Sequence, residues 1–203
     1  MSTSRHQHGP VEGFRSGRYP IGVSTHAYCY HVGRTLVDTG PPNQWRRVRA
    51  FVREMADERG IDRVVVTHHH EDHAGNAGRI AKMLDVPVFA PSASLDRLRD
   101  GFSMEMYRRV VWGSPMSVEA QPVPECLSIG NGLTLRTIAA PGHADDMVCY
   151  LIEETGGLFS ADLYIVQRPE YFRYDEHVGA LLRSLHRVLE HGVSTVYCAH
   201  RGI

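Results

Sequence analysis

The chain has 203 residues, of which 42% are hydrophobic and 22% charged, and its formal net charge at pH 7 is -1. These values are ordinary for a soluble globular protein, and the length suits one domain with a sizeable core. No stretch is apolar for long enough to span a bilayer, and residues 1–10 lack the apolar core of a signal peptide. We therefore expect a cytoplasmic protein with no membrane partner.

Residues 1–20 are mostly polar and are interrupted by glycine and proline, which predicts a flexible N-terminal arm. The interrupting residues are Gly9, Pro10, Gly13, Gly17 and Pro20. We expect residues 21–203 to form a single domain.

The first elements predicted in this domain are a hairpin and a helix. Residues 27–32 and 35–37, joined by a Gly-Arg turn, have the pattern of two antiparallel strands, and Asp38 follows the second. Residues 43–59 predict an amphipathic helix that ends at Gly60. Its arginines are mixed with acidic residues, which favours a solvated face over a nucleic-acid site.

Four titratable side chains follow the next predicted strand, residues 63–66. His68 and His70 are two residues apart, so on an extended segment both point to the same side and can bind one ion together. Asp72 and His73 can reach a second ion as the loop turns. Neutral imidazole and carboxylate groups suit Zn, Fe and Mn. Placing four such groups against an apolar strand is costly without a partner, which favours a metal site over a solvated loop.

The chain then alternates between helix and strand. Residues 75–84 predict a helix, 86–90 a strand and 92–98 a second short helix, an alternation typical of layered α/β architecture. Residues 101–122 are apolar but contain arginine and glycine. We interpret them as an inserted helix and loop over the mouth of an active site, with packing in the core as an equal alternative.

Three more candidate ligands follow predicted strands in the second half of the chain. They are His143 after the strand 133–138, Asp162 after the hairpin formed by 147–153 and 157–160, and His200 after the strand 193–198. Strand ends that meet at one sheet edge would bring these side chains to the histidine-rich loop. Before the last strand, residues 175–189 predict a helix whose buried stripe is Val178, Leu181, Leu182, Leu185 and Leu189.

The four cysteines are widely spaced and include no C-x-x-C pair. We therefore expect small buried thiols rather than disulfides or metal ligands. They are Cys29, Cys126, Cys149 and Cys198.

Together these motifs resemble the signature of the metallo-β-lactamase-fold hydrolase superfamily. The resemblance rests first on H-x-H-x-D-H after a strand that ends in threonine. It rests also on four other residues, which follow one another along the chain in the same order as in the family. These are Asp38 in Leu-Val-Asp-Thr-Gly, His143 in Ala-Pro-Gly-His, Asp162 in Phe-Ser-Ala-Asp and His200 in Cys-Ala-His. It extends from about Gly22 to the end of the chain and favours the glyoxalase II and lactonase-like branch. It implies an α/β fold, a four-layer αββα sandwich of two mixed β-sheets with helices outside.

The resemblance also implies a role for each ligand. His68, His70 and His143 would hold one cation, Asp72, His73 and His200 would hold a second, and Asp162 would bridge both. Asp38 would fix the loop of residues 67–73, named the metal loop from here on, without binding a cation. The expected cofactor is two Zn²⁺ per chain, with Fe or Mn as alternatives. Two cations about 3.5–4 Å apart can share a hydroxide with a pKa of about 7. This hydroxide would attack an ester, thioester or lactone carbonyl, while Asp72 orients it and shuttles its proton.

Single residues separate the activities known in this superfamily. Asp162 argues against a true β-lactamase, and His70 argues against a flavodiiron reductase. Lactonases carry a tyrosine three residues after the bridging aspartate, and here Tyr164 lies two after it. A substrate-binding role for Tyr164 is therefore a hypothesis, with core packing as the alternative.

Two other functions stay open. The turn 142–146 resembles that of small superfamily members described as endoribonucleases, so an endoribonuclease or phosphodiesterase is one alternative, although no basic stripe supports nucleic acid as a partner. A mononuclear iron persulfide dioxygenase, which uses a subset of these ligands, is the other. Two Zn per chain would favour hydrolysis, and one Fe would favour the dioxygenase. We expect a small-molecule substrate, and a homodimer is left open.

Overall fold

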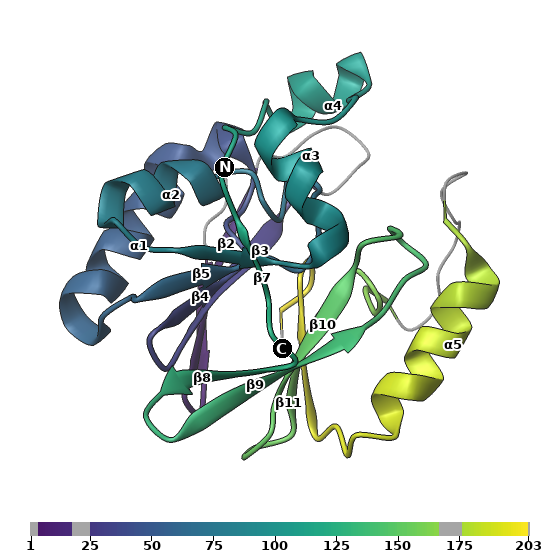
Figure 1. Ribbon diagram of the computed structural model, residues 1–203. Helices are drawn as coiled ribbons and strands as arrows, with labels where there is room; N and C mark the ends of the chain where they lie inside the picture. The colour runs from purple at the N-terminus through teal and green to yellow at the C-terminus, as the bar shows by residue number, and fades with distance from the viewer. Residues whose placement is uncertain (1–3, 18–24, 167–175, 203) are drawn as a thin grey trace.

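The computed structural model describes residues 4–17, 25–166 and 176–202, and two mixed β-sheets lie face to face at its centre (Figure 1). The first sheet has the strand order β1-β2-β3-β4-β5-β6-β7, antiparallel from β1 to β4 and parallel from β4 to β7. The second has the order β12-β11-β10-β9-β8, with only β11 and β12 parallel.

The strands of the first sheet are β1 (Ser4–His8), β2 (Val11–Ser16), β3 (Ala27–Val32), β4 (Thr35–Val37), β5 (Arg63–Val65), β6 (Val88–Ala90) and β7 (Gln121–Pro122). Those of the second are β8 (Cys126–Gly130), β9 (Leu133–Ala139), β10 (Val148–Ile152), β11 (Gly157–Ala161) and β12 (Thr195–Cys198). The helices are α1 (Trp45–Arg59), α2 (Ala77–Leu84), α3 (Leu95–Asp100), α4 (Met106–Val111) and α5 (Val178–Leu189), with 3₁₀ turns at Pro42–Gln44 and Ser92–Ser94.

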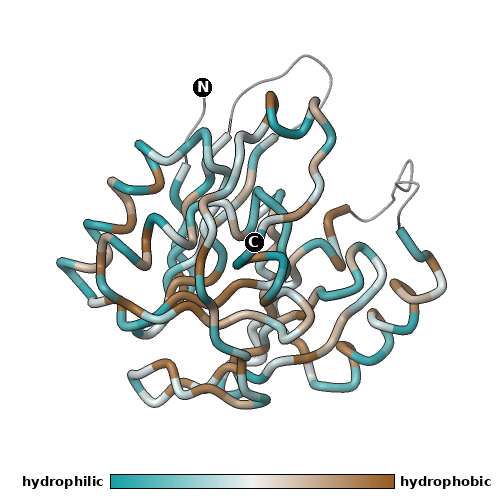
Figure 2. Tube along the Cα trace, turned by 45° about the horizontal axis from the view of Figure 1, so that its top comes forward, coloured by the Kyte–Doolittle hydropathy of each residue, from teal (hydrophilic) through white to brown (hydrophobic). Residues whose placement is uncertain are grey.

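Three apolar clusters hold four layers together. The first packs α1 and α2 on the outer face of the first sheet, the second fills the space between the sheets, and the third packs α5 on the outer face of the second sheet. Figure 1 shows α1 and α2 on one side of the sheets and α5 on the other. Hydrophobic stretches gather on the central strands, whereas the helices alternate between hydrophobic and hydrophilic residues (Figure 2). The predicted αββα sandwich is therefore confirmed.

The predicted flexible arm is wrong for residues 4–16. These residues form β1 and β2, and β2 pairs with β3 along its whole length. Val11 is fully buried, and the Phe14 ring stacks on Phe51 with ring centroids 4.8 Å apart. Strand pairing and this apolar contact outweigh the polar composition, so the segment is part of the sandwich.

Two glycines explain why this segment has the composition of a loop. Gly9 has φ 55°, a left-handed conformation that suits the turn between β1 and β2. A Cβ atom at Gly13 would lie 2.7 Å from Cε1 of Tyr30, so only glycine fits beside that ring. Pro20 lies outside the described residues.

Helix α1 confirms its predicted amphipathic pattern, but the predicted stripe of α5 is partly wrong. The buried residues of α5 are Leu181, Ser184 and Val188, whereas Leu182 and Leu189 are exposed. The face that packs on the sheet follows the i, i+3, i+7 spacing from Leu181 and accepts a serine, because the Ser184 hydroxyl donates to the Pro141 carbonyl at 2.8 Å. The predicted start of this helix at Asp175 lies outside the described residues.

Two further details differ from expectation. Cys126 is exposed, while the other three cysteines are buried free thiols as predicted. Cys126 begins β8, an edge strand that the sequence pattern did not reveal, and side chains of edge strands face solvent more often. None of the helices in the described part of the chain is long and apolar enough to cross a membrane.

If the N-terminal strands belong to the core, Phe14→Ala should lower the free energy of unfolding by about 3 kcal/mol, because it leaves a cavity against Phe51. Urea denaturation measures this loss. His6→Ala, on the exposed strand β1, is the matched control and should stay within about 0.5 kcal/mol of the parent. Equal stabilities of the two variants would contradict the packing of this segment.

Candidate metal centre

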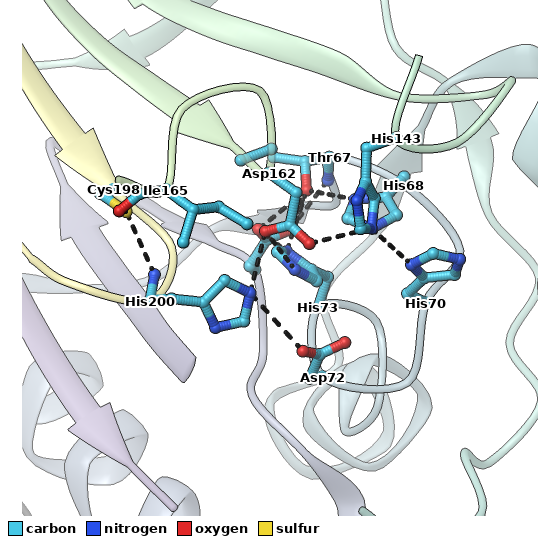
Figure 3. A network of polar contacts seen from close by, with 12 residues as sticks. Thr67, His68, His70, Asp72, His73, His143, Asp162, Ile165, Cys198 and His200 are labelled. Atoms are coloured by element: carbon cyan, nitrogen blue, oxygen red, sulfur yellow. Dashed lines mark hydrogen bonds and ion pairs between the residues drawn. The ribbon is translucent and has the colours of Figure 1, made fainter. Parts of the chain in front are cut away.

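Four turns of the backbone meet at one edge of the sandwich (Figure 3). Residues 67–73 leave β5, and His143 lies on the loop between β9 and β10. Asp162 follows β11 and His200 follows β12. Because β5 is parallel to β4, and β12 to β11, the C-terminal ends of each pair lie at the same edge of their sheet. The fold thus delivers polar side chains from both sheets to one place.

The structure brings all seven predicted ligands together in two groups. Within each group, the ligand atoms lie within 4.8 Å of one another. The first group is His68, His70, His143 and Asp162, and the second is Asp72, His73 and His200. This division agrees with the predicted ligand sets. That the groups bind cations stays a prediction.

Asp162 lies between the two groups. Its Oδ2 is 3.0 Å from Nε2 of His143 in the first group, and its Oδ1 is 2.9 Å from Nε2 of His200 in the second. In the first group, Nε2 of His143 is also 3.1 Å from Nδ1 of His70. One carboxylate therefore presents an oxygen to each group, the arrangement that a bridging ligand needs.

The second nitrogen of several ligand imidazoles is held by the protein. Nδ1 of His143 lies 2.6 Å from Oε1 of Glu176, and Nδ1 of His200 lies 2.7 Å from the carbonyl oxygen of His26. Such contacts fix the ring and its tautomer and leave Nε2 to face the site.

His73 is held in the same way by Asp38, the residue predicted to fix the metal loop. Oδ2 of Asp38 lies 2.8 Å from Nδ1 of His73, while Oδ1 accepts the backbone N–H of Thr67 at 2.8 Å. The Thr67 hydroxyl also donates to Oδ2, at 2.9 Å. Asp38 thus contacts both ends of the loop and lies in neither ligand group.

The donor atoms fit metal cations. One buried atom at this edge, Nε2 of His68, has no hydrogen-bond or ion-pair partner among the described residues. Unsatisfied polar atoms are costly in a protein interior, and coordination to a cation would satisfy them. Imidazole and carboxylate groups suit zinc, iron and manganese alike.

Comparison with known proteins identifies the family. A family model described as the metallo-beta-lactamase superfamily matches residues 22–200. The chain belongs to this superfamily.

Curated relatives and solved structures agree with this assignment. The Beta-lactamase-like protein 2 homolog of Caenorhabditis elegans is 26% identical over 196 residues, which are 94% of this chain and 60% of the relative. The Atrochrysone carboxyl ACP thioesterase of Claviceps purpurea (strain 20.1) is 25% identical over 186 residues, 91% of this chain and 50% of the relative. The chain thus spans about half to three fifths of the length of these two relatives. A metallo-beta-lactamase family protein from Thermus thermophilus has the same fold, with a TM-score of 0.70 at 23% identity, covering 95% of this chain and 74% of that chain.

The superfamily fold gives the histidines of the site two different electrostatic environments. Burial and neighbouring imidazoles lower the pKa of His68 and of His70 well below the ordinary value. Burial also acts to lower the pKa of His73 and His143, but nearby carboxylates, Asp162 first among them, outweigh it. They raise the pKa of His73 well above its ordinary value and that of His143 to about 9. In the metal-free protein, these carboxylates therefore favour the protonated form of the imidazoles around Asp162.

A cavity of about 520 Å³ adjoins the first ligand group. His70 and His143 line it, together with Phe102 and Arg108 from the segment 101–122. This placement supports the interpretation that the segment lies over the mouth of the site. Met104 is buried, so the same segment also packs into the core.

Tyr164 is not among the residues that line this cavity, and its side chain is 38% exposed. Its backbone carbonyl accepts a hydrogen bond from the Ser160 hydroxyl at 3.3 Å. Substrate binding by Tyr164 stays a prediction.

A buried ion pair at the site was not predicted. Glu71, between two candidate ligands, accepts two hydrogen bonds from Arg108 of α4, at 2.8 and 2.5 Å. Both side chains are largely buried, with exposed fractions of 1% for Glu71 and 9% for Arg108. The sequence signal was a pair of adjacent arginines within an apolar stretch, which reveals neither which arginine is buried nor its partner. The pair ties the inserted segment to the metal loop.

A second buried carboxylate, Asp146, was also missed. It accepts a hydrogen bond from the backbone N–H of His69 at 3.0 Å and another from the Ser94 hydroxyl at 2.6 Å. Asp146 lies in the turn 142–146, but nothing in the sequence predicted its contacts with His69 and Ser94.

Arg108→Met should lower the free energy of unfolding by about 3 kcal/mol, because Glu71 would keep a buried charge without a partner. Chemical denaturation of the metal-free protein measures this. The neighbouring Arg109 is exposed, so Arg109→Met is the matched control, with an expected change of at most about 0.5 kcal/mol. The double variant Glu71→Met/Arg108→Met should be more stable than Arg108→Met alone. A double variant that is less stable than the single one would contradict the role of the pair.

Metal binding should release protons. His143 has a raised pKa of about 9, so it carries a proton below that pH in the metal-free protein, and a cation must displace this proton. The affinity for Zn²⁺ should therefore rise with pH up to about 9. Calorimetric titration in buffers with different ionisation enthalpies counts the protons released. Zn²⁺ binding without proton release at pH 7 would contradict the protonation state described here.

Proposed function

We propose that the protein is a dinuclear metal-dependent hydrolase that cleaves an ester, thioester or lactone bond. The observation that carries the proposal is the placement of two ligand groups on either side of Asp162, beside a cavity large enough for a small-molecule substrate. The membership in a superfamily with this fold supports it.

In this proposal, one set of residues would bind the cations and another would orient the binding imidazoles. His68, His70 and His143 would hold one cation, Asp72, His73 and His200 the other, and Asp162 both. Cations held there would polarise a carbonyl oxygen and lower the pKa of a bound water to about 7. Glu176, the His26 carbonyl and Asp38 keep the imidazoles aimed at the site.

Asp72 is the candidate for handling the proton of the attacking water. Its Oδ2 lies 3.7 Å from Nε2 of His200, which places the carboxylate at the rim of the second ligand group. A carboxylate in that place can accept a proton and pass it to the leaving group. Because Glu71 is paired with Arg108, Asp72 is the neighbouring acid that stays available.

We favour a thioester as the substrate class. A relative from Claviceps purpurea is named as an acyl carrier protein thioesterase, and the match covers 91% of this chain. Cleavage of a thioester and of an oxygen ester requires the same polarised carbonyl and the same nucleophile, so both belong in a first substrate panel.

We further propose two Zn²⁺ per chain as the native metal content, with iron or manganese as alternatives. Elemental analysis of the purified protein tests this. Two zinc ions per chain would support the hydrolase. One iron per chain, with oxygen consumption in the presence of a persulfide, would contradict it and favour the dioxygenase.

His70→Ala should reduce the metal content and abolish hydrolysis, because it removes a ligand of the first group. The loss in kcat/KM should exceed the roughly 10–100-fold that removal of an outer hydrogen-bond partner costs in metal sites. The measurements are metal content and rates on a panel of thioester, lactone and phosphodiester substrates. His6→Ala removes an exposed histidine and is the control. A His70→Ala protein that retains two cations and full activity would overturn the proposed function, as would a parent that cleaves only phosphodiesters.

A further inference from the structure

His69 lies between two candidate ligands but belongs to neither ligand group. Its ring is nearly perpendicular to that of His68, at 89°, with ring centroids 6.4 Å apart. Its Nδ1 is 2.8 Å from Oδ2 of Asp146. The side chain is therefore turned toward the loop that follows His143.

Asp146 is in a position to fix both the ring and the tautomer of His69. Its side chain is fully buried, and its carboxylate contacts Nδ1 and the backbone N–H of His69 and the hydroxyl of Ser94. Burial acts to raise the pKa of Asp146, but the hydrogen bonds from His69 and Ser94 lower it below its ordinary value. The backbone N–H of His69 and the Ser94 hydroxyl both donate to this carboxylate, so it acts as an acceptor, and Nδ1 of His69 at 2.8 Å is placed as a third donor.

The other ring nitrogen of His69 is left for a ligand. In the tautomer whose Nδ1–H donates to Asp146, Nε2 is the acceptor nitrogen of the ring. In the part of the chain that the structure describes, no residue hydrogen-bonds to Nε2 of His69. The residue lines the 520 Å³ cavity beside His70 and His143, and the edge-on Phe102 ring, with ring centroids 4.7 Å apart, holds its plane.

We propose that His69 contacts the substrate, and that its Nε2 accepts a hydrogen bond from an O–H or N–H group close to the scissile bond. Asp146 is the positioning residue that keeps His69 in this orientation. The proposal rests on the proposed hydrolase function and narrows its substrate class to esters or thioesters that carry a hydrogen-bond donor near the carbonyl.

The first experiment tests the orientation of His69 without any substrate. Long-range ¹H–¹⁵N correlation spectra of the zinc-loaded protein distinguish the Nδ1–H tautomer, the Nε2–H tautomer and the imidazolium. The signals of His69 are assigned by their loss in His69→Asn. We expect the Nδ1–H tautomer in the parent, and either other form would overturn the proposal.

The second experiment tests the substrate contact. The probes are four thioesters, with butyryl or 3-hydroxybutyryl on ethanethiol or on N-acetylcysteamine, so that the set carries no donor, a hydroxyl on the acyl side, an amide N–H on the thiol side, or both. His69→Asn is the informative variant, because an asparagine amide can still donate to Asp146 from the position of Nδ1 but has no atom at the position of Nε2. The readout is the ratio of kcat/KM between each donor-bearing probe and butyryl ethanethiol.

We expect the parent to favour at least one donor-bearing probe by about tenfold, the amount that one hydrogen bond supplies. The ratio should fall to near one in His69→Asn. Asp96→Asn, which alters an exposed carboxylate that does not line the cavity, should keep the ratio of the parent. Metal content is measured on each variant, and loss of zinc from His69→Asn would overturn the proposal in favour of a role in holding the metal loop.

A ratio near one in the parent, or the same ratio in the parent and His69→Asn, would also overturn it. A parent that hydrolyses none of the four probes would overturn the proposed thioester function and the substrate contact together. In that case the tautomer measurement still decides whether Asp146 positions His69.

Discussion

The carboxylate of Asp38 is the contact on which the site depends. It accepts the backbone N–H and the hydroxyl of Thr67 at the start of the metal loop, and it lies 2.8 Å from Nδ1 of His73 at the end of that loop. The backbone of Asp38 has φ 56°, a left-handed conformation that residues other than glycine rarely adopt. Its conformational strain is about 1–3 kcal/mol. Its hydrogen bonds hold it there. A loop that is bound at both ends by one carboxylate can present several imidazoles in fixed directions, which is what a preorganised metal site requires.

The two sheets are joined at the same edge by hydrogen bonds that cross between them. The Tyr150 hydroxyl donates to the carbonyl of Val66 at 2.8 Å, and the backbone N–H of Val148 donates to the carbonyl of Thr67 at 2.9 Å. These bonds set the second sheet in register with the strand that carries the metal loop. Around Asp162, negative charge is matched by imidazoles from both sheets, and burial makes each of these interactions stronger than it would be in water. Packing and electrostatics thus depend on the same register.

The parts that the sequence predicted well are those whose signal is local. His68 to His73 lie within one short loop, and α1 has a regular apolar stripe, so each can be recognised from neighbouring residues. The N-terminal hairpin was missed because its glycines resemble those of a loop, although Gly13 is required by the ring of Tyr30. The contacts of Glu71 with Arg108 and of His69 with Asp146 join residues far apart in the chain. No periodicity in the sequence encodes such pairs, and only the packed structure reveals them.

The origin of the ligands has a consequence for how the two sheets are connected. Each ligand group takes residues from both sheets, since residues 67–73 leave the first sheet and His143, Asp162 and His200 come from the second. Neither half of the chain alone can assemble a complete coordination sphere. A cation that takes all the donors of either group would therefore also join one sheet to the other.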